Sequence, residues 1–463
     1  MGKRRFAIVA VVAVAGLLRL HGALSARLTF DESLTLALAE PVAGAAGAWS
    51  VGPSDHPPVG HWAVRASGAL FGMSDAGLRG LSVLCGAVTV LLVYLLGRRL
   101  WGERTGLLAA ALLAVDRFHA SWSRLLVEES PLQMFAALAL LLTARAVGRP
   151  APCRLADWAA VGVAIGLAAL AKETALLLLP ALALALLATA AGRRSLRGFG
   201  PGFATLLAVA AAGLELMRSA PHFPAGIVGR ALLLAEWTGG PSPIATSPYL
   251  GELYRWLMGP EVLDSDYAEG AAFAAFWPVG LFYLVAVLAA LRHPAPADRL
   301  PLVVFWVVFV FFTLTGGRDT FDPFWWASLS VVPAVLLAGR LIDRALAARP
   351  RLRVGLFAAL GSLAVATAVT LARPGLGAPR VTREEWARRV AEDGARGLDA
   401  GDLGRALTQA QLSATMDPEG PGRALLLRLC DSPEAVHEAP RFLGAVRSAL
   451  GGRGAPEGHP PRP

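Results

Sequence analysis

The sequence predicts an all-α polytopic membrane protein. Of its 463 residues, 55% are hydrophobic and only 17% are charged, and the mean hydropathy is +0.54. Soluble proteins carry roughly 25% charged residues, so this composition excludes a soluble globular enzyme and a disordered chain. The hydrophobic residues also come in long runs, such as 6–24, 156–192 and 300–314, which are typical of membrane-spanning helices.

We expect about eleven spans, since each helical span needs roughly 20 residues. In chain order, their approximate boundaries are 6–24, 80–96, 105–118, 131–146, 157–171, 174–191, 199–215, 271–291, 300–315, 323–341 and 354–371.

The distribution of basic residues predicts the orientation of these spans. The loops on one side hold 19 Lys or Arg in 54 residues, and those on the other side hold 10 in 134 residues. Because cytoplasmic loops are enriched in Lys and Arg, we expect a cytoplasmic N-terminus and two long loops that face outward. An odd number of spans then also puts the tail outside. A cleaved signal peptide over the first run is an alternative that leaves every later loop in place.

The last 90 or so residues differ from the rest, because they are polar and their acidic and basic residues nearly balance. We expect helices over 383–396 and 401–412 and disorder over 451–463. The sequence therefore predicts a transmembrane domain over 1–371 and a small, partly disordered accessory tail over 372–463.

The net charge of +9 does not indicate nucleic-acid binding, because the basic residues sit at the ends of apolar runs and form no stripe. The three cysteines, Cys85, Cys153 and Cys430, form no CxxC pair. Neither a thiolate zinc site nor a disulfide framework is supported.

Charged residues collect in five clusters on the outward side. Asp31 and Glu32 follow the first span, where a carboxylate pair can act as a general base or simply lie at a helix N-terminus. His56 precedes two prolines that fix the backbone in an extended form, and an amphipathic stretch over 59–71 follows. A rigid turn with incidental histidines is the alternative at the second cluster.

The third cluster runs from Arg124 to Glu129, at the entry to the fourth span. Arg124 can bind a phosphate with two N–H groups, and Glu129 lies at the membrane boundary. A capped helix start, with Ser130 as N-cap and Pro131 at the first helical position, is compatible with that role.

The last two clusters are Lys172, at the turn of a long apolar hairpin, and Arg318, between two late spans. Each can bind an anion at the membrane surface, or can be a simple turn marker or a solvated loop residue. Together the five clusters indicate a site for a lipid-linked phosphate, with the lipid tail against the spans and a carboxylate near the incoming hydroxyl.

The order of these motifs resembles a known family. Asp31-Glu32 after the first span, then His56-Pro57-Pro58, then Ser123-Arg124 with Glu129-Ser130, is similar to the lipid-phosphate-dependent membrane glycosyltransferases of GT-C fold. That group includes the protein O-mannosyltransferases and the lipid A aminoarabinose transferases. The segment from Ala164 to Thr174 also resembles the sequences of this family, although the family more often has Gly at the position of Glu173.

The resemblance implies inverting transfer of a sugar from a polyprenyl-phosphate donor to a hydroxyl of a protein, lipid or glycan. It implies Asp31 as the catalytic base, with Glu32 supporting it or binding the acceptor. Arg124 and Lys172, and less directly Arg318, would hold the donor phosphate. His56 would order the first loop, and Glu129 would position sugar or acceptor groups. It leaves open whether a divalent cation takes part, since members differ.

Two other functions fit the same spans. A transporter or flippase for a lipid-linked substrate would share the outward charge, but the inverted repeats of many transporters are not evident in this sequence. A membrane scaffold that docks partners through its tail would leave the order of the motifs unexplained.

Overall fold

The structure, a computed structural model, describes residues 2–25, 32, 58–126, 128–148, 155–189, 192–193, 200–206, 208–209, 277–315, 328–372, 383–401, 403–416 and 420–438. All regular secondary structure in these residues is helical. His56, Asp31 and Arg318 lie outside the described residues.

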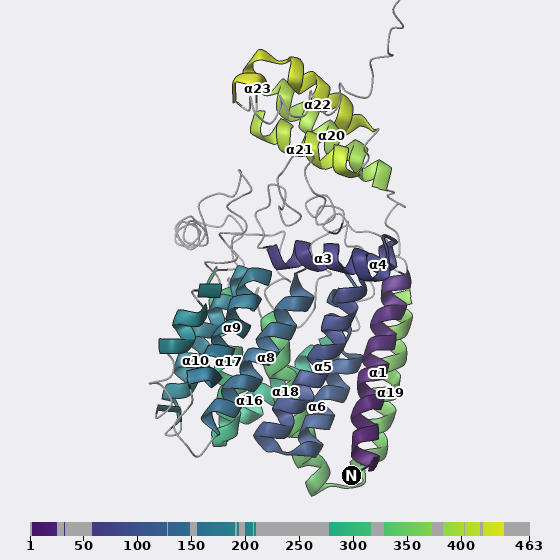
Figure 1. Cartoon of the computed structure of the whole chain (residues 1–463). Helices are drawn as coiled ribbons and strands as arrows, with labels where there is room; N and C mark the ends of the chain where they lie inside the picture. Colours follow the sequence, from purple (N-terminus) through teal and green to yellow (C-terminus); the bar gives the residue numbers. More distant parts are fainter. Residues whose placement is uncertain are drawn as a thin grey trace, which may run out of the picture. The chain divides into compact units, whose positions relative to one another are not determined.

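Long helices form most of the described chain (Figure 1). They are α1 (Gly2–Ser25), α5 (Gly80–Trp101), α6 (Glu103–Val115), α8 (Glu129–Val147), α9 (Leu155–Ala171), α10 (Leu178–Leu187), α16 (Trp277–Arg292), α17 (Arg299–Thr315), α18 (Ser328–Ala348) and α19 (Leu352–Ala372). Shorter segments link them: α3 (Pro58–Phe71), α4 (Asp75–Leu78), α7 (Arg117–Trp122), η1 (Glu173–Leu177) and η4 (Pro296–Asp298).

The helices match the expected spans closely. Of the span expected over 199–215, residues 200–206 and 208–209 are described, and they are helical. Among the described residues four helices are long and apolar enough to cross a membrane, and three shorter apolar helices accompany them. The count of eleven spans stays a prediction.

One expected boundary is wrong, at the end of the third span. We expected that span to continue to residue 118, but α6 ends at Val115 and α7 begins at Arg117. The carboxylate of Asp116 accepts a hydrogen bond from the backbone N–H of His119 at 2.7 Å. Asp116 is therefore the N-cap of a new helix, and this local bond breaks the apolar run.

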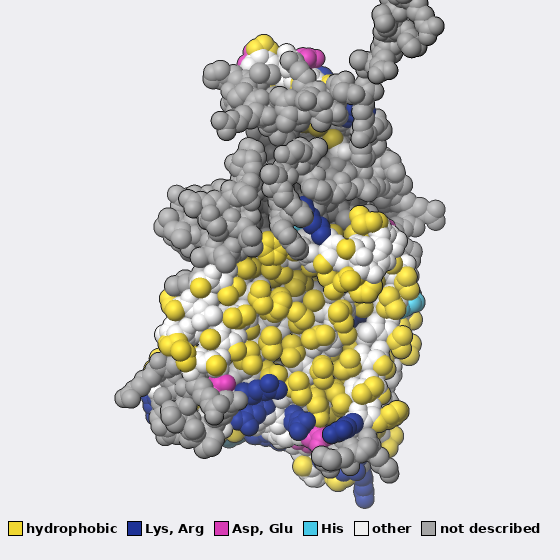
Figure 2. Space-filling model, in the orientation of Figure 1, with side chains coloured by type: hydrophobic (Ala, Val, Ile, Leu, Met, Phe, Trp, Pro, Cys, Tyr) yellow, Lys and Arg dark blue, Asp and Glu magenta, His cyan; other side chains and the backbone are white. Residues whose placement is uncertain are grey.

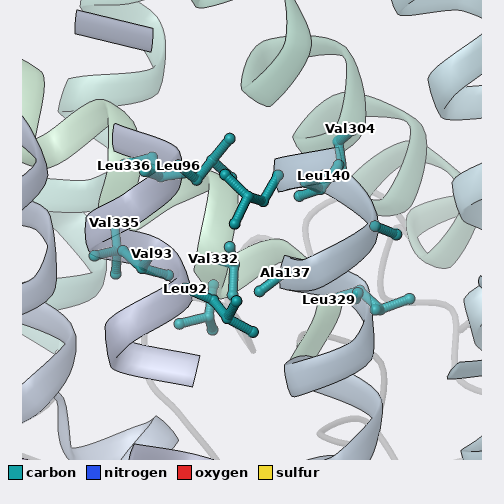
Figure 3. Close-up of a cluster of buried hydrophobic side chains, with 14 of the residues drawn as sticks. Leu92, Val93, Leu96, Ala137, Leu140, Val304, Leu329, Val332, Val335 and Leu336 are labelled. Carbon is teal, nitrogen blue, oxygen red and sulfur yellow. The ribbon is translucent and has the colours of Figure 1, made fainter. Parts of the chain in front are cut away.

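The centre of the bundle is formed by α5, α6, α8 and α18. Figure 3 shows Leu92 and Leu96 of α5 meeting Ala137 and Leu140 of α8 and Val332 of α18. Small residues let the backbones approach where these helices cross. A Cβ at Gly97 would meet the Cα of Gly106 at 2.8 Å, and one at Gly339 would meet the backbone of Ala109 at 2.7 Å. Such contacts are typical of packing between membrane helices, where van der Waals contact drives association.

The flank of the bundle is apolar, and one of its ends is lined with charged side chains. Figure 2 shows hydrophobic side chains over the helices and Lys and Arg side chains gathered at one end. The exposed apolar residues include Phe6 and Leu17 of α1 and Val354 and Phe357 of α19. A lipid-facing surface explains this distribution, since a soluble protein would expose a patch of this size only at an interface.

At the charged end of the bundle, two carboxylates tie several helices together. Asp298 of η4 accepts a hydrogen bond from the Trp101 indole at 2.8 Å and pairs with the Arg340 guanidinium at 2.7 Å. Asp343 of α18 pairs with Arg104 at 2.9 Å and accepts the Thr105 hydroxyl at 2.6 Å. We call this group the Asp298–Asp343 network.

The chain also contains a second compact unit, which includes Glu32 and the tail helices. These helices are α20 (Arg383–Asp399), α21 (Leu403–Met416), α22 (Pro421–Asp431) and α23 (Pro433–Glu438). The first two confirm the helices expected from the sequence, and α22 and α23 were not foreseen. Their small core is formed by Ala406, Ala410, Leu425, Leu429 and Cys430.

Candidate functional site

Four of the seven predicted site residues fall in the described residues: Glu32, Arg124, Glu129 and Lys172. Glu32 is buried and belongs to the second compact unit, so it is not placed relative to the other three. The remaining predictions, Asp31, His56 and Arg318, stay predictions.

Glu129 and Lys172 come together although they are 43 positions apart in the chain. Nζ of Lys172 lies 2.5 Å from Oε1 of Glu129, and both residues are buried. The topology explains the meeting, because α8 and α9 are packed side by side and joined by a short connection. Glu129 begins α8 and Lys172 follows the end of α9, so an antiparallel pair of similar length brings them to the same end.

The local structure holds both side chains at that end. Glu129 lies in the first turn of α8, where the helix dipole favours a negative charge. Lys172 adopts an extended backbone between α9 and η1, with φ −155° and ψ 133°, which interrupts the apolar hairpin. The turn that the sequence predicted at Lys172 is thus present, and its ammonium points to a carboxylate of the neighbouring helix.

The expected cap of this helix is wrong. We expected Ser130 as N-cap, but α8 begins at Glu129 and Glu128 occupies the N-cap position. The Ser130 hydroxyl instead donates a hydrogen bond of 2.7 Å to the carbonyl of Ser82 in α5. Ser130 therefore fixes the start of α8 against α5, which in turn fixes Glu129.

Only one of the two Glu129 carboxylate oxygens has a hydrogen-bond partner among the described residues. Oε1 accepts the Lys172 ammonium, whereas Oε2 is buried and has no hydrogen-bond partner among the residues that the structure describes. A buried carboxylate oxygen without a donor is costly, and such an oxygen is a candidate acceptor for a hydroxyl or an ammonium group of a ligand.

An amphipathic helix lies over this region. In Figure 1, α3 runs across the ends of α5 and α9, as expected for the amphipathic stretch over 59–71. Gly60 of α3 packs directly on Glu128, since a Cβ at Gly60 would lie 2.7 Å from Cγ of Glu128. Two adjacent carboxylates therefore lie at the start of α8, with Glu128 against Gly60 of α3 and Glu129 paired with Lys172.

Arg124 is held by two other helices. Its Nη1 donates a hydrogen bond of 3.1 Å to the carbonyl of Leu371, in the last turn of α19. Its side chain also packs on Gly22 of α1, where a Cβ would lie 2.7 Å from Cδ of Arg124. The predicted phosphate-binding arginine thus contacts the end of the last predicted span.

Other buried arginines also donate hydrogen bonds to carbonyls at the C-terminal ends of helices. Arg19 donates to the carbonyls of Leu113 and Ala114 at the end of α6, and Arg79 donates to Ala23 at the end of α1. The last four carbonyls of a helix have no partner within it, and a membrane interior offers little water to satisfy them. Cationic side chains at these C-termini supply the missing donors and also favour the helix dipole.

The sequence analysis missed a buried cluster of polar side chains that includes Ser123, the residue before Arg124. The Tyr283 hydroxyl of α16 donates to Asp116 at 2.8 Å, and Arg19 of α1 lies 2.5 Å from Nδ1 of His119. Arg19 also donates to the Ser123 hydroxyl at 3.2 Å. The available signal was an arginine inside the first apolar run, six residues before the end of α1. Such a residue seldom faces lipid and normally finds partners inside the bundle.

The described residues contain no group of three or more His, Cys, Asp or Glu side chains that is arranged to hold a metal ion.

A protein-family model and curated relatives match the first part of the chain. The model described as dolichyl-phosphate-mannose-protein mannosyltransferase matches residues 55–214. An undecaprenyl phosphate-alpha-4-amino-4-deoxy-L-arabinose arabinosyl transferase of Pseudomonas aeruginosa strain LESB58 is 35% identical over 149 residues, which is 32% of this chain and 27% of that protein. A homologous enzyme of Pseudomonas fluorescens strain Pf0-1 is 32% identical over 132 residues, or 27% and 23% of the two chains. The matched region thus spans about a quarter of these relatives.

Solved structures extend the likeness over nearly the whole chain. ArnT from Cupriavidus metallidurans, bound to undecaprenyl phosphate, superposes with a TM-score of 0.56 and 19% identity, over 96% of this chain and 76% of that one. The Archaeoglobus fulgidus oligosaccharyltransferase gives a TM-score of 0.51 and 15% identity, over 86% and 56%. These likenesses confirm the fold that the sequence resemblance implied, the GT-C fold of an all-α multi-pass membrane protein.

Proposed function

We propose that this chain, with its GT-C fold, is a glycosyltransferase that moves a sugar from a polyprenyl-phosphate donor to a hydroxyl of a protein, lipid or glycan. The observation that carries the proposal is the buried Glu129–Lys172 pair, with one carboxylate oxygen available to a ligand at the end of the helices. The fold and the matched region over 55–214 support it.

The proposed site lies at a membrane boundary, which suits a substrate that cannot leave the bilayer. We place the protein in a cell inner or plasma membrane, and the distribution of basic residues supports a cytoplasmic N-terminus with the site outside. The catalytic domain then comprises residues 1–371, and residues 372–463 form an accessory tail.

In the proposed reaction the acceptor oxygen attacks the anomeric carbon of the sugar, and the bond between that carbon and the phosphate oxygen breaks. Polyprenyl phosphate leaves with the electron pair, so negative charge grows on the phosphate. Asp31 takes the proton of the acceptor hydroxyl, and Glu32 supports it or binds the acceptor. Attack on the side opposite the leaving group inverts the anomeric configuration.

The other predicted residues align the reactants and offset the growing charge. Lys172, Arg124 and Arg318 hold the donor phosphate, and His56 orders the first loop against the donor. Glu129 orients Lys172 through Oε1 and positions a sugar or acceptor hydroxyl through Oε2. A leaving group that is already stabilised requires mainly this alignment, proton removal and charge stabilisation.

The test is sugar transfer in membranes that contain the full chain, with radiolabelled polyprenyl-phosphate sugars as donors. We expect Asp31→Asn to abolish transfer at equal protein level. Asp75→Asn is the matched control, because Asp75 is an exposed acid in the first turn of α4, on the same predicted side of the membrane. Unchanged transfer in Asp31→Asn would refute the proposed base. Movement of labelled donor across the membrane without a glycosylated product would instead favour a flippase.

A further inference from the structure

A cavity of about 220 Å³ lies at the other end of the bundle from Glu129 and Lys172. It opens between the last turns of α5, α8 and α10 and the start of α17, and it is far larger than the roughly 30 Å³ that one water occupies in the liquid. Its walls are mainly apolar, with Val147, Leu186 and Leu300 among the lining residues. In a membrane protein, an apolar cavity that opens at the ends of the spans is suited to a lipid.

One guanidinium lines this cavity. Arg99 of α5 is exposed and donates a hydrogen bond of 3.4 Å to the carbonyl of Ala144 at the end of α8. Gly148 allows this placement, because a Cβ there would clash with the guanidinium of Arg99. This single, long bond uses one of the five N–H groups of the guanidinium.

The surroundings of the cavity are basic. Arg145 of α8 is exposed and follows the lining residue Ala144 in the chain. No carboxylate lines the cavity among the described residues, and nearby Asp298 is already bound by Trp101 and Arg340. The local charge therefore favours an anion.

We propose that this cavity binds an anionic phospholipid of the adjoining leaflet, with the lipid phosphate on Arg99 and an acyl chain against Val147, Leu186 and Leu300. Basic pockets between membrane helices commonly bind such head groups. The proposal concerns the end of the bundle remote from Glu129 and does not depend on the sugar transfer proposed above.

The experiment is native mass spectrometry of the purified full chain in detergent, titrated with phosphatidylglycerol or with phosphatidylcholine of the same acyl chains. We expect tighter binding of phosphatidylglycerol, and a loss of about fivefold in its affinity in Arg99→Gln, the contribution of one arginine near an anionic lipid. Arg98→Gln is the matched control, because Arg98 is exposed on the same helix and does not line the cavity.

Because Arg99 also contacts the end of α8, its loss could disturb the fold, and a second variant avoids that problem. Ala297→Phe fills the cavity from η4 and leaves Arg99 in place. We expect it to weaken phosphatidylglycerol binding while thermal unfolding of the lipid-free protein is unchanged. Equal binding of the two lipids by the wild type would overturn the proposal. The proposal would also be overturned if Arg98→Gln and Arg99→Gln lost affinity for phosphatidylglycerol equally, or if Ala297→Phe bound phosphatidylglycerol as tightly as the wild type does.

Discussion

The two ends of the helical bundle use buried charge in different ways. In the Asp298–Asp343 network, Asp298 binds side chains of α5 and α18, Asp343 binds two side chains of α6, and both oxygens of each carboxylate have partners. At the other end, Glu129 binds Lys172 through one oxygen, and the second has no partner among the described residues.

This difference separates a structural role from a ligand-binding one. A network in which every carboxylate oxygen has a partner links α5, α6, η4 and α18 and offers a ligand little. A half-satisfied buried carboxylate costs stability, and binding sites are where proteins commonly keep such a group. The comparison therefore predicts that charge removal affects transfer at one end and stability at the other.

The largest effect is expected at the Glu129–Lys172 pair. Lys172→Met leaves a buried carboxylate without its cation, which costs about 3–5 kcal/mol of stability. In the proposed reaction Lys172 stabilises the charge on the departing phosphate, so we expect transfer to fall by about a hundredfold or more. Thermal unfolding in detergent and transfer per folded molecule measure the two effects separately.

The double variant Glu129→Gln/Lys172→Met sharpens this test. Because neither buried charge remains, we expect most of the stability to return while transfer stays lost. A double variant that regains both stability and transfer would show that the pair only supports the fold. It would then belong with the Asp298–Asp343 network.

A smaller and purely structural effect is expected for Asp298→Asn. The change weakens the contacts to Arg340 and Trp101, and hydrogen bonds to a charged group contribute about 1.5–3 kcal/mol each to stability. We expect a lower unfolding temperature and unchanged transfer per folded molecule. If transfer fell while the protein stayed stable, the contrast between the two ends would be wrong, because the end with the Asp298–Asp343 network would then contribute to the reaction.

The sequence predicted most of the fold because apolar runs and basic loop ends follow directly from the physics of the bilayer. It predicted the turn at Lys172 and the boundary position of Glu129, but not that the two residues pair. That pairing follows from how α8 and α9 pack. It also missed the partners of Arg19 and Arg124, since the carbonyls at helix C-termini occur in every sequence. Helix packing decides which arginine binds these carbonyls, and no sequence pattern indicates the outcome.

The smallest effect is expected for Thr105→Val, within the Asp298–Asp343 network. Thr105 and Thr143 are both buried threonines, but their hydroxyls differ in what they bind. Thr105 donates to Asp343 of another helix at 2.6 Å, whereas Thr143 donates to Ala139 of its own helix at 2.8 Å. Because the first bond joins two helices and its acceptor is a carboxylate that keeps Arg104, its loss should cost about 1.5 kcal/mol, the low end for bonds to a charged group. Thr143→Val removes a bond to a carbonyl of its own helix and should cost less, as thermal unfolding of both variants can measure. Equal losses would show that the hydroxyl of Thr105 adds nothing to the link between α6 and α18, which would then depend on Arg104 and apolar packing.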